Sequence, residues 1–277
     1  MLDEYELINE VSRFLPTFQA KKKGTQDYYT IIKIKKKDDE IPSSTQLFNE
    51  AISIIKEINH PNIVKLVEYK EDSNYHYCIM EYCNGGDIGS YLTKRKENNK
   101  PISEEEVQYI MKQVVDAIKY LHEKKIVHRD IKPDNLLIKY DTEEDLKENN
   151  ILKAKIKLSG FEISSHIKEG GFLDLVAGTL HYIAPEIDIQ HKEYNEKVDI
   201  WSLGVTFTDL FFCDLKFEPR KPETYDKEFS FPNLSKESNS FINCTLQYNP
   251  EKRKSAEELL KHDFLTKNTK DFCVSKA

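Results

Sequence analysis

The first eighty residues contain short runs in which apolar and polar residues alternate. Such runs, rich in β-branched and aromatic residues, cover 5–11, 28–34, 63–69 and 75–80, and the pattern is typical of β-strands. One segment differs, because 44–58 carries apolar residues at three- and four-residue steps, which predicts a helix. We therefore predict a small β-rich unit with one main helix.

From about residue 85 onward the pattern is mostly helical. Ser103-Glu-Glu-Glu106 reads as a capping box, and apolar residues recur behind it at helical spacing. Residues 198–212 are apolar on nearly all sides, which predicts a helix in the centre of this part. Ser255-Ala-Glu-Glu258 predicts a last amphipathic helix that reaches Phe264. The polar segment 139–155 predicts an exposed loop or an extended hairpin.

Composition limits the classes of protein to consider. The chain has 277 residues, of which 39% are apolar and 32% charged, and it shows no repeat or low-complexity linker, so we expect one globular domain. A net charge of −7 does not indicate nucleic-acid binding. No run is long enough for a membrane span. The five cysteines lack the paired spacing of a zinc site, and we expect reduced thiols in a cytoplasmic protein.

The segment His128-Arg-Asp-Ile-Lys-Pro-Asp-Asn135 resembles the catalytic loop of eukaryotic protein kinases. Further segments resemble other motifs of that family and follow in the family's order: Thr30-Ile-Ile-Lys33, His60-Pro-Asn-Ile-Val-Lys-Leu66, Glu81-Tyr-Cys-Asn-Gly-Gly-Asp87, Gly178-Thr-Leu-His-Tyr-Ile-Ala-Pro-Glu186, Asp199-Ile-Trp-Ser-Leu-Gly204 and Arg253. The resemblance extends from about Tyr5 to Leu265. It implies a bilobal protein-kinase fold of the α+β class.

The resemblance also implies the division of the chain. A single kinase-like domain, 1–277, would have its N-lobe in 1–82, a hinge in 83–87 and its C-lobe in 88–277. Lys132 and Thr179 resemble the serine/threonine branch, and the hinge and catalytic loop are similar to those of Unc-51-like or NIMA-related kinases.

Site roles follow from the same resemblance. Asp130 would be the base that accepts the substrate proton, Lys132 would steady the transferred group, Asn135 would bind metal and Lys33 would bind the α- and β-phosphates of ATP. The remaining ATP-binding positions would be Met80 as gatekeeper, Glu81, Cys83, Asp87 and Leu137. An alternative is that these residues persist because the fold needs them.

The chain departs from the family at the metal site. Gly160-Phe-Glu162 replaces Asp-Phe-Gly, and magnesium prefers carboxylate oxygens that Gly160 lacks. In an extended segment Glu162 would project to the same side as Gly160 and could replace the missing ligand. Phe161 is kept, which predicts a preserved hydrophobic spine of Phe161, His128, Ile55 and Leu66. We do not expect a bound magnesium ion.

Three further departures affect the nucleotide pocket. No glycine lies between residues 5 and 23, so the backbone of the glycine-rich loop would not approach phosphates closely. The glutamate that normally pairs with the lysine falls on Ala51, next to Glu50. Ile31 takes the place of a small alanine, and with Phe18 it would occupy the adenine space. Whether ATP binds is therefore open.

Two expectations concern the C-lobe surface. Arg129 is expected to pair with Glu169 or Asp174. The reason is that the activation segment, 160–186, has no hydroxyl between Ser165 and Thr179 that could carry an activating phosphate. The stretch between Phe212 and Phe231 is short and polar, which predicts a reduced substrate-holding helix.

The sequence therefore favours a pseudokinase that binds a protein partner, either an active kinase or a scaffold. Two alternatives stay open. The chain could be an active serine/threonine kinase with an atypical metal site, or a module that binds nucleotide without metal. All three share one fold and differ in the pocket between the lobes.

Overall fold

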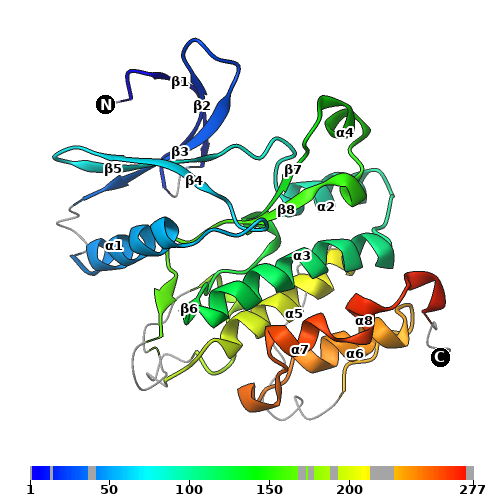
Figure 1. Ribbon diagram of the computed structural model, residues 1–277. Helices are drawn as coiled ribbons and strands as arrows, with labels where there is room; N and C mark the ends of the chain where they lie inside the picture. The colour runs from blue at the N-terminus through cyan, green and yellow to red at the C-terminus, as the bar shows by residue number, and fades with distance from the viewer. Residues whose placement is uncertain are drawn as a thin grey trace.

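The computed structural model describes residues 2–12, 15–36, 42–167, 173, 178–187, 193–212 and 228–272. Within them a β-rich N-lobe lies on a larger helical C-lobe (Figure 1). This arrangement confirms the predicted α+β, bilobal fold.

The N-lobe contains one antiparallel sheet in the order β1-β2-β3-β5-β4. Its strands are β1 (Tyr5–Ser12), β2 (Thr17–Lys22), β3 (Tyr28–Lys35), β4 (Leu66–Glu71) and β5 (Tyr75–Glu81), and helix α1 spans Pro42–Glu57. Strand β2 was not predicted, and β4 begins at Leu66 rather than at residue 63, because the preceding residues bond to the C-lobe. Val64 N donates to Leu158 O, at 3.0 Å.

The two faces of this sheet belong to different cores. Ile34, Cys78 and Met80 are buried in the main core of the molecule, together with Ile52 and Ile55 of α1. The opposite face carries a separate cluster, formed by Tyr5, Ala20, Ile31, Tyr77 and Ile79. We call the face that carries Ile34 the inner face and the face that carries Ile31 the outer face. Because side chains alternate along a strand, neighbouring residues of β3 point to different faces.

The C-lobe is built around two long helices. Its helices are α2 (Ile88–Glu97), α3 (Glu104–Glu123), α4 (Glu143–Glu148), α5 (Lys197–Phe212), α6 (Lys236–Thr245), α7 (Ala256–Leu260) and α8 (Asp263–Thr266). Two short strand pairs complete it, β6 (Ile126–Val127) with β9 (Ser165–His166) and β7 (Leu136–Lys139) with β8 (Lys155–Leu158). Both predicted capping boxes are present, at Ser103 and at Ser255.

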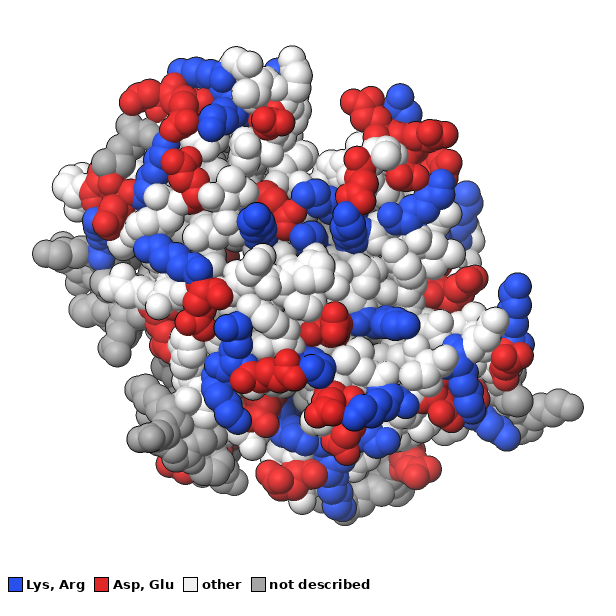
Figure 2. Space-filling view, in the orientation of Figure 1, with Lys and Arg blue, Asp and Glu red and all other residues white. Residues whose placement is uncertain are grey.

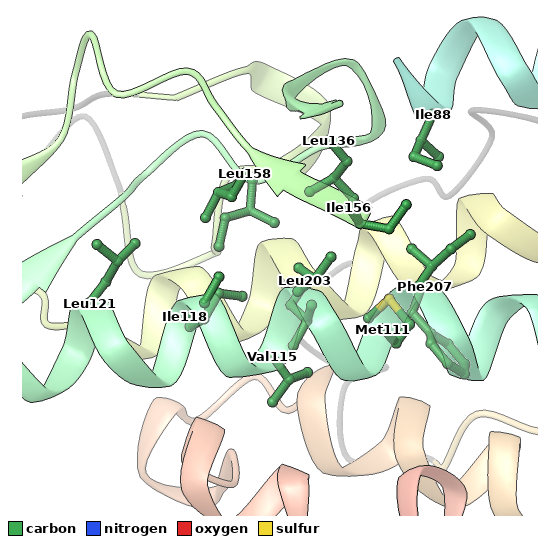
Figure 3. Packing of buried hydrophobic residues seen from close by; sticks show 14 of the residues in the cluster. Ile88, Met111, Val115, Ile118, Leu121, Leu136, Ile156, Leu158, Leu203 and Phe207 are labelled. Carbon is green, nitrogen blue, oxygen red and sulfur yellow. The ribbon is translucent and has the colours of Figure 1, made fainter. Parts of the chain in front are cut away.

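Strands β7 and β8 pack on α3, and α3 packs on α5 (Figure 3). Leu136, Ile156 and Leu158 lie above Ile118 of α3, and Leu203 of α5 lies beyond it; each of these side chains is at most 1% exposed. This core supports the catalytic loop, which directly precedes β7.

Two segments differ from the sequence-based expectation. The segment 139–155 does form a hairpin, but helix α4 lies inside it, capped by the Thr142 side chain. The predicted last helix is divided into α7 and α8, because His262 caps α8 with its own ring nitrogen.

The surface carries charged side chains of both signs (Figure 2). Lysine, arginine and carboxylate side chains are interspersed over the face in Figure 2, with acidic residues gathered over α4. No helix in the described ranges is long and apolar enough to cross a membrane. The predicted reduced helix between Phe212 and Phe231 lies largely outside the described residues.

Candidate active site

The catalytic loop is held by Asp199, which α5 places in the centre of the C-lobe. The backbone N–H groups of His128 and Arg129 donate to its two oxygens, at 2.9 and 2.8 Å, and His122 Nε2 lies 2.9 Å from Oδ2. Burial opposes ionisation of Asp199, but the His122 hydrogen bond and charge hold its pKa below the usual value. These bonds fix Arg129 at a positive φ of 70°. The loop therefore has a structural role whether or not it is catalytic.

Asp130 is already surrounded by donors from its own chain. Lys132 Nζ lies 2.8 Å from Oδ2, and the Thr179 hydroxyl donates to Oδ1 at 2.5 Å. Lys132 also donates to Thr179, at 2.6 Å. Burial opposes ionisation, but the hydrogen bonds from Lys132 and Thr179 keep the pKa of Asp130 below its usual value. Asp130 is thus an ionised carboxylate facing the end of the activation segment, where a substrate hydroxyl would have to approach.

Asn135 and Gly160 share the place that a metal site would need. The Asn135 Nδ2 donates to Asp130 O and Oδ2, at 2.7 and 2.8 Å. A Cβ added to Gly160 would lie 2.4 Å from the Asn135 amide carbon. The amide therefore fills the space of the missing carboxylate. No cluster of three His, Cys, Asp or Glu side chains suited to a metal occurs in the described ranges, and neither Asn135 nor Gly160 supplies a carboxylate oxygen of the kind that magnesium prefers.

Glu162 lies close enough to Asp130 and Lys132 for both charges to act on its carboxyl group. The chain turns after Phe161, because Ser164 N donates to Phe161 O at 3.0 Å, so the segment is not extended there; replacement of the missing ligand by Glu162 stays a prediction. Burial raises the pKa of Glu162, and the negative charge of Asp130 acts in the same direction.

The predicted positions of Lys33 and Ile31 are wrong by one residue. Ile31 belongs to the outer cluster with Tyr77, and Lys33 pairs with Tyr77 in the ladder. The Lys33 ammonium lies 3.9 Å from the centre of the Tyr75 ring, a cation–π contact. Both side chains therefore point away from α1 and from the interlobe side of the sheet. Ile31 does not occlude the adenine space, and Lys33 is not placed to bind phosphates.

The inner face of β3 carries other residues at these positions. Thr30 pairs with Met80, and Ile32 pairs with Cys78, and both Met80 and Cys78 belong to the main core. In β2, Gln19 rather than Phe18 stands opposite Thr30. Ile32 therefore occupies the inward position next to the gatekeeper, and it is apolar. Strand alternation relative to Ile34 is the signal that could have revealed this from the sequence.

Helix α1 is joined to the activation segment instead of to β3. Ala51, the expected position of the lysine-pairing glutamate, is buried. Glu50 accepts from the Ser165 hydroxyl at 2.6 Å and from His166 N at 2.8 Å, and Glu57 lies 3.0 Å from His166 Nε2. The link therefore runs from α1 to β9. The predicted contacts of Arg129 with Glu169 or Asp174 lie outside the described residues, and Arg129 donates to Ile163 O at 2.5 Å.

Two of the predicted spine residues are in direct contact. His128 and Phe161 meet edge to face, with ring centres 4.7 Å apart. Ile55 is buried in the same core, and Leu66 packs against it. Packing between the lobes is thus retained without the polar groups of the phosphate site.

The predicted hinge, 83–87, lies between the end of β5 and the start of α2. Met80 and Cys83 are buried, and burial raises the pKa of the Cys83 thiol to about 12. Asp87 caps α2 through Ser90 N, at 2.7 Å, and forms an isolated antiparallel β-bridge with Leu137. Glu81 contacts two lysines that the sequence did not suggest, Lys139 and Lys157.

The described motifs agree with sequence comparisons. A profile of the protein kinase domain family matches residues 14–265. A protein of Dictyostelium discoideum named "Probable myosin light chain kinase" is 33% identical over 96% of this chain and 85% of its own length. The serine/threonine-protein kinase atg1 of the same organism is 31% identical, over 84% of this chain and 34% of its own length. The Homo sapiens serine/threonine-protein kinase ULK1 is 29% identical, over 91% of this chain and 24% of its own length. The chain thus belongs to the protein kinase family, and its relatives are serine/threonine kinases.

Proposed function

We propose that this chain is a pseudokinase, a kinase-fold module that binds a protein partner and transfers no phosphate. The observation that carries the proposal is the apolar Ile32 on the inner face of β3, with Lys33 turned outward onto Tyr75. Kinases place a β3 lysine on the phosphates and hold magnesium with a carboxylate and an asparagine. Here the first group faces away, and Gly160 offers no carboxylate.

Magnitudes favour inactivity over slow catalysis. A metal that neutralises developing charge contributes several kcal/mol to transition-state stabilisation. A preorganised donor contributes about 3–4 kcal/mol in comparable sites. Losing both, even with strong non-additivity, would reduce a typical turnover of about 10 per second by several orders of magnitude.

We propose a protein as the partner, either an active kinase or a scaffold. The net charge of −7 does not favour nucleic acid. The buried C-lobe core and the His128–Phe161 contact are retained, which suits a binding module. The partner's identity would follow from its effect on a kinase assay that contains both proteins.

A second candidate function is an active serine/threonine kinase. It is favoured by the intact arrangement of Asp130, Lys132 and Thr179 at hydrogen-bond distances. It would use Glu162 as the carboxylate that replaces the one missing at Gly160. A third candidate, nucleotide binding without metal, would use the hinge alone.

A phosphate-transfer assay separates these functions. With labelled ATP, magnesium and a generic protein substrate, we expect the purified chain to give the same background signal as its Asp130→Ala variant. Transfer by the natural chain that disappears in Asp130→Ala would establish the active-kinase alternative and refute the proposal.

A further inference from the structure

Glu81, at the end of β5, is bonded to two lysines of the other lobe. Its Oε2 lies 2.5 Å from Lys139 Nζ on β7, and its Oε1 lies 2.7 Å from Lys157 Nζ on β8. Lys65 N donates to Oε1 as well, at 2.9 Å. Lys157 is only 9% exposed and Glu81 only 12%. Charged hydrogen bonds that are shielded from water in this way are stronger than ion pairs on the surface.

Backbone bonds surround this cluster. Val64 N donates to Leu158 O, and Leu158 N donates to Asn62 O, which joins the segment before β4 to β8. Gly85 N donates to Ile138 O, which joins the hinge to β7. Strands β7 and β8 thus lie between the N-lobe sheet and α3 (Figure 1). Lobe rotation would stretch the side-chain and backbone bonds together.

We infer that Glu81, Lys139 and Lys157 form an interlobe latch that holds the two lobes in one relative orientation without any nucleotide. Kinases close around ligands by hinge and shear movements of their lobes. Such movement would separate Glu81 from Lys139 and Lys157, which is unfavourable above all for Glu81 and Lys157, because these two have little access to water. None of the three side chains takes part in the contacts of Asp130, Asn135 or Gly160, so the latch does not depend on whether the chain is catalytic.

Hydrogen exchange on the intact chain, without nucleotide, tests the latch. In Glu81→Gln we expect the interlobe amides of Val64, Gly85, Ile138 and Leu158 to exchange at least about tenfold faster, because local opening costs less free energy. The matched control is Glu71→Gln. It removes the same charge from a pair with Lys36 (2.7 Å) inside the N-lobe and should leave the interlobe amides unchanged.

A second variant, at a more exposed residue, distinguishes interlobe opening from global unfolding. Lys139 is 31% exposed, so Lys139→Met should fold, and we expect a smaller acceleration of the same four amides. Unchanged exchange in both variants would overturn the latch. Equal acceleration of the α3 core amides would also overturn it, because the effect would then be global rather than interlobe.

Discussion

An Arg253→Met variant is expected to lose about 3–5 kcal/mol of the free energy of unfolding, because it leaves a partner without its buried countercharge. The Arg253 side chain is fully buried and binds Glu186 with two nitrogens, at 2.5 and 2.7 Å. It also donates to Gln247 O and Lys197 O, and its guanidinium lies 5.1 Å from the centre of the Trp201 ring. Equilibrium unfolding in urea measures the loss.

Lys261→Met is the matched control. Lys261 pairs with Glu257 one helical turn away at 2.7 Å, but its side chain is 73% exposed. Exposed pairs of this kind contribute about 0.3–0.5 kcal/mol. A loss below about 1 kcal/mol for Arg253→Met would contradict the structural role assigned to the buried pair, since such pairs normally cost more to break.

Gly160→Ala is expected to destabilise the protein by about 2–5 kcal/mol, the sum of two effects. The positive φ of 83° costs a non-glycine residue roughly 1–2 kcal/mol. The new methyl group would also meet the Asn135 amide, at 2.4 Å. Asn135 can yield only by breaking its bonds to Asp130, which adds about 1–3 kcal/mol.

Two further variants separate these effects. Gly24 has a φ of +77° and no atom within 4 Å of an added Cβ, so Gly24→Ala measures the backbone effect alone. In an Asn135→Ala background the overlap is gone, and the cost of Gly160→Ala should fall to that of Gly24→Ala. Equal costs for Gly160→Ala and Gly24→Ala in the natural background would contradict the packing of Asn135 against Gly160.

The order of elements and the lobes could be predicted from the sequence, because hydrophobic periodicity and capping boxes depend on local residues. The capping boxes at Ser103 and Ser255 are examples. The catalytic loop and its anchor Asp199 were identified for a related reason, since both lie within continuous motifs. Gly160 was recognised as a lost ligand from its motif position alone.

The orientation of Lys33 could not be predicted in this way. Motif position places a lysine in a strand, but the strand's register decides which face it takes, and a shift of one residue reverses the face. Pairing of Ile32 with Cys78 fixes that register. The turn at Phe161–Ser164 and the contacts of Glu81 likewise depend on tertiary structure. Lys157 and Glu81 are 76 residues apart in the chain.

The chain keeps the packing of a kinase, and the polar residues of its candidate site form hydrogen bonds with other residues of the chain. Asp130 binds Lys132 and Thr179, Asn135 binds Asp130, and Glu50 binds β9. In a catalytic kinase such groups are directed at metal, nucleotide and substrate. The contacts of Asp130 with Lys132 and Thr179 fit both candidate functions, so the proposed binding role rests on Ile32, Lys33 and Gly160 instead.

Thermal unfolding with ATP tests the central claim, that the cleft does not hold magnesium and nucleotide together. The unfolding temperature would be measured at a fixed, saturating ATP concentration with magnesium and with a chelator, and with magnesium alone as the control. We predict the same temperature in all three samples. Binding at a hundred times the Kd would add about 2.7 kcal/mol of stability, or about 5–10 °C, and a rise of that size seen only with magnesium and ATP together would contradict the account.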